Sequence, residues 1–148
     1  MQFSIWERQK TITRQLFAWA GLSILIGGIL NLDEDRFRKG VGVQFAGWGL
    51  INALIAIFGS RATARRKAQL LDPEGAEVTT VERQKLRRLL WLNTVLDVFY
   101  MLGGGWLARS KGRNDRYWRG QGLGIILQGA FLFFFDLLHA LFLQERRG

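Results

Sequence analysis

Four long stretches of this chain carry almost no charge, and they constrain the fold more than any other feature. They cover residues 16–32, 41–60, 89–108 and 121–143. Each is close to the roughly 20 residues that a helix needs to cross about 30 Å of hydrocarbon. Pro73 is the only proline, and it lies between the second and third stretches. The sequence therefore predicts an all-α integral membrane protein, with four transmembrane helices in a single domain over residues 1–148.

The composition supports this class and excludes others. The chain is 49% hydrophobic yet contains 21 Lys and Arg against 12 Asp and Glu, and the charges lie between the apolar stretches. Cysteine is absent and histidine occurs once, which excludes disulfides, thiolate chemistry and a bis-histidine haem site within one subunit. We expect the lipid bilayer as partner, and no nucleic acid, because membrane topology already accounts for the basic charge. We also expect no cofactor and no metal site.

Two short motifs occur twice in the same order. Residues 4–10 (SIWERQK) resemble residues 79–85 (TTVERQK), and residues 35–42 (DRFRKGVG) resemble residues 115–122 (DRYWRGQG). Two ordered matches, each ahead of an apolar stretch, predict a duplicated helical hairpin. In this 2+2 parallel repeat, repeat 1 covers about 4–60, a cytoplasmic connection covers about 61–80, and repeat 2 covers about 79–143.

The repeated residues have expected structural roles. Ser4 and Thr79 each stand three residues before a Glu, which is the spacing of a capping box at a helix N-terminus. Gly42 and Gly49 are seven residues apart, and the corresponding glycines 122 and 129 have the same spacing. Each glycine pair thus lies on one helix face, where it permits the close backbone approach by which membrane helices pack.

The distribution of Lys and Arg predicts the orientation. Three lie in the N-terminal arm, eight in residues 61–88 and two in the tail (Arg146 and Arg147), whereas the two hairpin turns together hold eight. The positive-inside rule then places both termini in the cytoplasm of a bacterial cytoplasmic membrane. We expect anionic lipid headgroups at that surface to contact Arg65, Arg66, Lys67, Arg87 and Arg88.

Each apolar stretch contains a polar residue nine positions from its nearest flanking charge. These residues are Ser23, Asn52, Asp97 and Asp136. At 1.5 Å per residue they all lie roughly 13–14 Å deep, near the bilayer midplane. Other polar and aromatic residues share their helix faces, so the candidate ligand-binding layer comprises Asp97, Asp136, His139, Asn52, Asn93, Tyr100, Gln128, Gln44, Ser23 and Trp48.

The two acids in this layer favour a binding role. A carboxylate at mid-bilayer costs roughly 2.5–3.5 kcal/mol on insertion scales. One of Asp97 and Asp136 then carries a proton, or His139 or a bound cation compensates both. The leading hypothesis is a small binding or transport protein with a mid-membrane site for a proton, a cation or a lipophilic ligand with a polar head. Four helices enclose little lumen, so a homo-oligomer or a lipid-facing groove would supply the space.

Two alternatives remain at this stage. In an assembly or accessory subunit, the polar layer would only join helices, at about 0.6 kcal/mol per contact. This is the interpretation that we favour for Gln44 and Gln121. In an intramembrane lipid-modifying enzyme, Asp136 and His139 would share a helix face. No nucleophile motif or metal-binding cluster accompanies that pair, so we rank an enzyme last.

Two segments also resemble known sequences. They are QFAGWGLIN at residues 44–52 and QGAFLFFFDLLHA at residues 128–140. Both resemble segments of small uncharacterised bacterial membrane proteins with four spans. The resemblance implies a four-helix protein of the bacterial cytoplasmic membrane, and it brings neither a substrate nor a catalytic residue.

Overall fold

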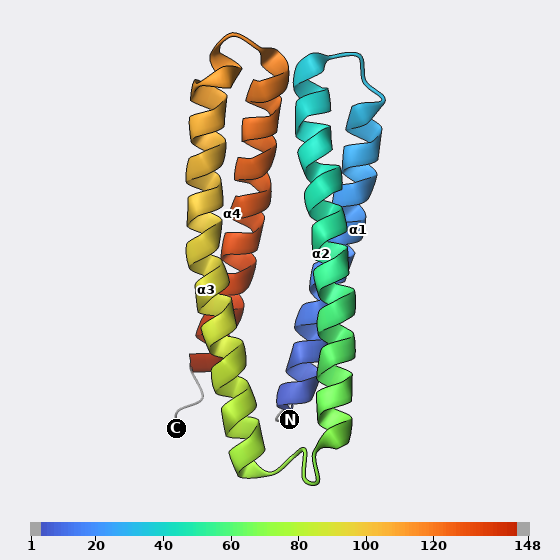
Figure 1. The fold of residues 1–148 in the computed structure, drawn as a ribbon, viewed down its shortest axis with the longest axis vertical. Helices are drawn as coiled ribbons and strands as arrows, with labels where there is room; N and C mark the ends of the chain where they lie inside the picture. Colours follow the sequence, from blue (N-terminus) through green and yellow to red (C-terminus); the bar gives the residue numbers. More distant parts are fainter. Residues whose placement is uncertain (1–3, 145–148) are drawn as a thin grey trace.

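The computed structural model describes residues 4–144, which form four long helices (Figure 1). They are α1 (Ile5–Asn31), α2 (Arg36–Gln69), α3 (Ala76–Arg109) and α4 (Arg116–Gln144), with a short 3-10 helix η1 (Lys111–Arg113) before α4. The four long helices cover the predicted apolar stretches except for Leu32, which follows the end of α1, so the all-α architecture is confirmed. Arg146 and Arg147, which contributed to the charge argument, lie outside the described residues.

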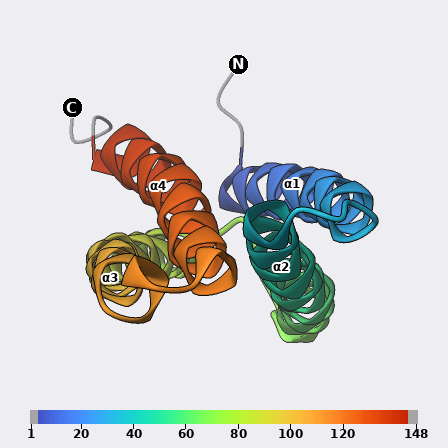
Figure 2. The same ribbon diagram turned by 90° about the horizontal axis from the view of Figure 1, so that it is seen from above.

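The helices form two hairpins, α1–α2 and α3–α4. Seen from above, α2 and α4 lie side by side at the centre, and α1 and α3 lie outside them (Figure 2). Both hairpin turns lie at one end of the bundle. The α2–α3 connection lies at the other end, near the start of α1 and the end of α4 (Figure 1). We call these the turn end and the connection end.

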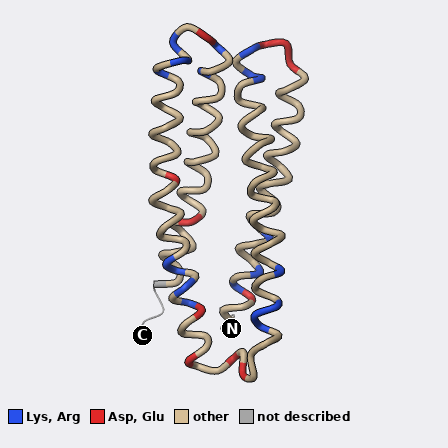
Figure 3. The backbone as a smooth tube through the Cα atoms, in the orientation of Figure 1, with Lys and Arg blue, Asp and Glu red and all other residues tan. Residues whose placement is uncertain are grey.

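The bundle has an apolar middle and charged ends. Lys, Arg, Asp and Glu gather at both ends, and the tube between them is nearly free of charge except for acidic positions on the α3–α4 side (Figure 3). Three helices, α1, α2 and α4, are long and apolar enough to cross a membrane. α3 is 34 residues long, but Asn93 and Asp97 lower the hydropathy of its apolar stretch.

The predicted caps have different outcomes. Ser4 caps α1 as expected, because its Oγ accepts a hydrogen bond from the Glu7 backbone N–H at 3.3 Å. The prediction for Thr79 was wrong, because α3 begins at Ala76 and Thr79 lies in its first turns. The Asp72–Gly75 turn, closed by a backbone hydrogen bond of 3.2 Å, lets the helix start directly after Gly75. A second hydroxyl cap is therefore unnecessary there.

Glycines bring the helix backbones together within each hairpin. A Cβ added at Gly27 would lie 2.7 Å from the Gly42 carbonyl oxygen, and one at Gly104 would lie 2.7 Å from that of Gly122. Across the two hairpins, an added Cβ at Gly120 would lie 2.0 Å from the carbonyl oxygen of Phe37. The predicted role of small residues in packing therefore matches the observed contacts, and such approaches stabilise helix pairs in lipid.

Two reciprocal ion pairs join the hairpins at the turn end. Arg36 donates to both carboxylate oxygens of Asp115, at 3.0 and 2.9 Å, and Arg116 donates to Asp35 at 2.8 Å. The Arg36 guanidinium, together with the backbone N–H of Tyr117, lowers the pKa of the Asp115 carboxyl below its usual 3.8. The repeated Asp-Arg dipeptide thus forms a clasp between the hairpins, a role that its position in the sequence did not reveal.

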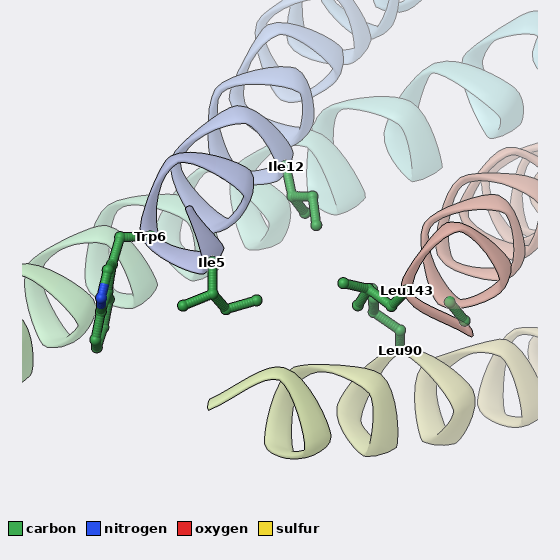
Figure 4. Close-up of a cluster of buried hydrophobic side chains, with 6 residues drawn as sticks. Ile5, Trp6, Ile12, Leu90 and Leu143 are labelled. Atoms are coloured by element: carbon green, nitrogen blue, oxygen red, sulfur yellow. The ribbon is translucent and has the colours of Figure 1, made fainter. Parts of the chain in front are cut away.

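A hydrophobic cluster closes the connection end. Ile5 and Ile12 of α1 point toward Leu90 of α3 and Leu143 of α4 (Figure 4). Beside them, the Trp6 indole N–H donates to the Pro73 carbonyl at 2.8 Å and ties α1 to the α2–α3 connection. Contacts therefore join the two hairpins at both ends of the bundle.

Candidate functional site

A pocket of about 130 Å³ lies between α2 and α3 in the apolar middle of the bundle. We call it the acid pocket. Its polar and aromatic lining consists of Trp48, Asn52, Asn93, Asp97, Tyr100 and Asp136. The remaining lining is apolar and includes Leu16 of α1 and Leu132 of α4. All four helices therefore contribute, and six of the ten residues of the expected layer meet here.

The two acids lie together at the bottom of this pocket. Asp97 is 3% exposed and Asp136 is 7% exposed, and both side chains line this one pocket. The lining of the acid pocket contains no Lys, Arg or His from the described part of the chain. Two carboxylates in one buried pocket repel each other strongly unless a proton or another cation lies with them.

Polar atoms in the acid pocket also lack partners. Asp97 Oδ2 and Asn52 Nδ2 are buried, and neither has a hydrogen-bond partner within residues 4–144. A buried polar group without a partner costs about 1–3 kcal/mol. A buried acceptor and a buried donor beside the acid pair therefore lack partners among the described residues.

Aromatic side chains form the outer edge of the pocket. Trp48 and Tyr100 meet edge to face, with ring centroids 5.0 Å apart. Tyr100 and Leu96 line the pocket and are also exposed on the bundle surface. The acid pocket therefore opens sideways between α2 and α3, toward the surroundings of the bundle.

A larger space of about 280 Å³ continues from the acid pocket toward the connection end. We call it the apolar cavity after its aliphatic and aromatic residues, although its lining also includes Gln9, Thr13, Thr63, Arg66 and Lys85. The two spaces share Leu16, Ile55, Asn93 and Asp136 in their linings. At its far end lies Glu82, which is buried and pairs with Arg66 at 2.6 Å and with Lys85 at 3.5 Å. The sequence had suggested only a capping role for Glu82, so this ion cluster was missed.

The opposite side of the bundle, between α1 and α4, is filled. Trp19 stacks on Phe131 with ring centroids 3.6 Å apart and an interplanar angle of 9°. Its indole N–H donates to Gln128 Oε1 at 3.1 Å, and Gln128 Nε2 donates to Ser23 Oγ at 3.1 Å. Gln128 and Ser23 are fully buried. These two expected layer residues thus lie away from the acids in a hydrogen-bonded plug that Trp19 completes.

The remaining layer residues, His139 and Gln44, also lie outside the acid pocket. His139 Nε2 is 3.0 Å from Gln15 Oε1, and His139 Nδ1 has no partner among the described residues. His139 thus faces α1 and forms no hydrogen bond with Asp136. Gln44 Nε2 donates to Gln121 Oε1 at 2.6 Å, which fits the packing role expected for this pair.

The expected headgroup residues lie around the α2–α3 connection. Arg65 and Arg88 are exposed, and Arg87 is half-buried. Arg66 and Lys67 instead form ion pairs with Glu82 and Glu74, at 2.6 and 3.2 Å. Within residues 4–144, no group of three or more His, Asp and Glu side chains could hold a metal ion.

Comparison with known sequences and structures gave one match. A family model described as a family of unknown function, DUF6992, matches residues 15–137. No curated protein and no solved structure matches the chain. The match agrees with the expected resemblance to proteins without an established activity, and a bacterial source stays a prediction.

Proposed function

The chain belongs to DUF6992, a family of unknown function, and we propose that it is a small membrane protein that binds or transports a proton or a cation at the acid pocket. The observation that carries this proposal is that two buried carboxyl groups, Asp97 and Asp136, line one pocket without a basic residue in its described lining. Neighbouring acids bind positive charge, because each raises the affinity of the other for it.

We propose that all four helices cross the membrane. The outward face of α3 supports a fourth span, because its exposed side chains between residues 89 and 106 are large and apolar. They include Leu89, Leu92, Phe99, Leu102 and Trp106. An apolar surface of this extent is unfavourable in water and fits contact with lipid. Asn93 and Asp97, which lower the hydropathy of α3, face the acid pocket instead.

We also propose a duplicated hairpin with both termini in the cytoplasm. Corresponding contacts recur 80 residues apart, as Gly40 meets Tyr117 and Gly120 meets Phe37. In the outer helices α1 and α3, corresponding positions are 77 residues apart, since Gly27 meets Gly42 as Gly104 meets Gly122. The Glu-Arg-Gln-Lys match is 75 residues apart, so it does not join equivalent positions. The basic connection end then faces the cytoplasm, where Arg65 and Arg88 would meet anionic headgroups.

The proposed symmetry makes the difference between the two sides meaningful. The α1–α4 side and the α2–α3 side would be equivalent in a duplicated protein. One is closed by the Trp19–Phe131 stack and the Gln128 hydrogen bonds, and the other holds the acids and the unpartnered polar atoms. This contrast supports specialisation of the α2–α3 side for binding.

A second candidate function is an accessory subunit in which polar residues only pack helices. The hydrogen-bonded Gln128 plug and the Gln44–Gln121 hydrogen bond, taken without the acids, favour this packing role. The acids differ from those residues, because Asp97 Oδ2 remains without a partner among residues 4–144. A packing role alone does not account for two adjacent acids.

Thermal unfolding with and without a small cation tests the proposal. Purified protein in nanodiscs of zwitterionic lipid would be heated with increasing methylammonium chloride, with tetramethylammonium chloride and NaCl as ionic-strength controls. A ligand at 100 times its Kd stabilises the native state by about 2.7 kcal/mol. Methylammonium should raise the Tm of the wild type, and Asp97→Asn or Asp136→Asn should abolish the rise while the variants stay folded.

The accessory-subunit function predicts another pattern. Both substitutions would then lower the Tm, and methylammonium would have no effect beyond that of NaCl on any variant. That result would overturn the proposed function.

A further inference from the structure

Building on the proposed function, we infer that the ligand of the acid pocket is an amphipathic organic cation. Its amine or ammonium head binds between Asp97 and Asp136, and its apolar body occupies the apolar cavity. The inference comes from the continuity of the two spaces and from the different chemistry of their walls.

The two spaces form one elongated site. The acid pocket measures about 130 Å³ and the apolar cavity about 280 Å³, and they share four lining residues. Together they are within the range of sites that hold small organic ligands. From Asp97 to Glu82 is 15 residues along α3, or roughly 22 Å at 1.5 Å per residue. The site is therefore too long for an inorganic ion alone.

The lining changes along this length from the two acids, through a stretch rich in apolar side chains, to the ion cluster of Glu82, Arg66 and Lys85 at the far end. The head region has the two carboxyl groups, and the buried Asp97 Oδ2 has no hydrogen-bond partner among residues 4–144. Trp48 and Tyr100 stand beside it, and aromatic faces attract organic cations. The body region has eight aliphatic or aromatic side chains, namely Ile12, Leu16, Ile55, Ala56, Leu86, Leu89, Leu90 and Phe135. Its lining also includes Gln9, Thr13 and Thr63 and ends at the ion cluster of Glu82, Arg66 and Lys85.

Other ligand classes fit less well. An anion would be repelled by the acid pair. A neutral lipophile would fill the apolar cavity but leave the carboxyl groups uncompensated in the acid pocket, whose described lining has no basic residue. Arg66 and Lys85, at the far end of the apolar cavity, pair with Glu82 instead. A divalent metal ion prefers several oxygen ligands, and the described residues contain no group of three acids or histidines for one.

The opening of the acid pocket gives such a ligand a route. Leu96 and Tyr100 lie both in its lining and on the bundle surface. Amphipathic cations accumulate in bilayers with their apolar parts in the hydrocarbon, so they would reach this opening laterally. On entering, the cationic head of the ligand leaves the lipid headgroups and contacts Asp97 and Asp136 in their place.

A substitution can block the apolar cavity without disturbing the helices. Gly59 lines the cavity, and a Cβ added there meets no atom within 4 Å. Gly47 lies on the same helix and is equally free of neighbours, but it lines neither space. Gly59→Phe therefore fills the proposed body site, and Gly47→Phe is its matched control.

The probe is a dansyl-labelled pentylamine, with its N-acetylated form as the neutral control, in nanodiscs of zwitterionic lipid. Binding is measured by energy transfer from tryptophan to dansyl. The amine should bind the wild type at least tenfold more tightly than the acetylated form. Gly59→Phe and the smaller Gly59→Leu should each weaken amine binding at least tenfold, and Gly47→Phe should not. The Tm of each variant verifies its folding.

Two outcomes overturn the inference, and they differ from failure of the proposed function. If methylammonium stabilises the wild type but the dansyl amine does not bind, the site takes a small cation only. If the amine binds equally to Gly59→Phe and Gly47→Phe, its body lies outside the apolar cavity. If neither cation has any effect on the wild type, the proposed function fails together with the inference.

Discussion

The close approach of α2 and α4 makes a sharp prediction for Gly120→Ala. A Cβ at Gly120 would lie 2.0 Å from the Phe37 carbonyl oxygen and 2.9 Å from its carbonyl carbon. Both are backbone atoms, so no side-chain rotation can relieve the clash. The two central helices must separate by roughly 1 Å or more before the methyl group fits.

The net cost follows from two opposing terms. Inserting a methyl group into a packed interface typically costs about 1–3 kcal/mol. Replacing glycine by alanine within a helix recovers about 0.5–1 kcal/mol of backbone entropy. The expected net loss is therefore up to about 2.5 kcal/mol. At Gly103 an added Cβ meets nothing within 4 Å, so Gly103→Ala should be neutral or stabilising by up to about 1 kcal/mol.

Thermal unfolding followed by tryptophan emission measures both variants in the same lipid. For a chain of about this size, each kcal/mol of lost stability is expected to lower the Tm by about 2–4 °C. Gly120→Ala should therefore lower the Tm by several degrees, and Gly103→Ala should leave it unchanged or raise it. Equal shifts for the two variants would refute the argument that backbone contact at Gly120 holds the hairpins together.

Three other predictions concern the clasp and the plug. In a double-mutant cycle, Arg36→Ala and Asp115→Ala should be non-additive in Tm, because each removes the same bidentate ion pair; additive effects would contradict the clasp. Arg36 lowers the pKa of Asp115. The contribution of this ion pair to the stability of the folded protein is therefore complete above about pH 4 and is lost as the pH falls below the usual pKa of 3.8. Asp115→Asn should therefore remove part of the acid-induced fall in Tm measured between pH 6 and 3. Gln128→Leu leaves the Trp19 N–H and the Ser23 hydroxyl without their partner. At about 0.6 kcal/mol per hydrogen bond, the substitution should lower the free energy of unfolding by about 1 kcal/mol. An unchanged Tm would show that the plug does not contribute to stability.

The helical architecture was predictable because lipid leaves few alternatives. A backbone in hydrocarbon must satisfy its own hydrogen bonds, so an uncharged stretch of about 20 residues indicates a helix. The glycine spacing within residues 42–49 and 122–129 likewise predicted the packed faces. The start of α3 was not predictable from the Thr79 pattern, because the Asp72–Gly75 turn decides where the helix begins.

The site was only partly predictable. The position of a polar residue between flanking charges gives its depth, so Asn52, Asp97 and Asp136 were expected near one another. Depth does not say which neighbouring helix a side chain faces. The sequence therefore could not show that Ser23 lies in the plug and not in the acid pocket.

Trp19 gave no sequence signal at all. Tryptophan in an apolar stretch is equally compatible with contact to lipid, and only its stacking on Phe131 reveals its role. The Glu82 ion cluster was hidden for a related reason. Its partner Arg66 comes from α2, and their pairing depends on the angle between α2 and α3 beyond the apolar stretches.

The most direct test of the account is the reactivity of a single cysteine at position 93 compared with position 92. The chain has no cysteine of its own, so Asn93→Cys and Leu92→Cys each introduce one thiol. Asn93 lines both spaces, whereas Leu92 is exposed on the outer face of α3. In nanodiscs, the account predicts that a cationic methanethiosulfonate reagent modifies the Asn93→Cys variant much faster than the Leu92→Cys variant, since a thiol in hydrocarbon stays protonated and unreactive. Two unreactive thiols would contradict an accessible acid pocket, and two equally reactive thiols would contradict a helix embedded in lipid.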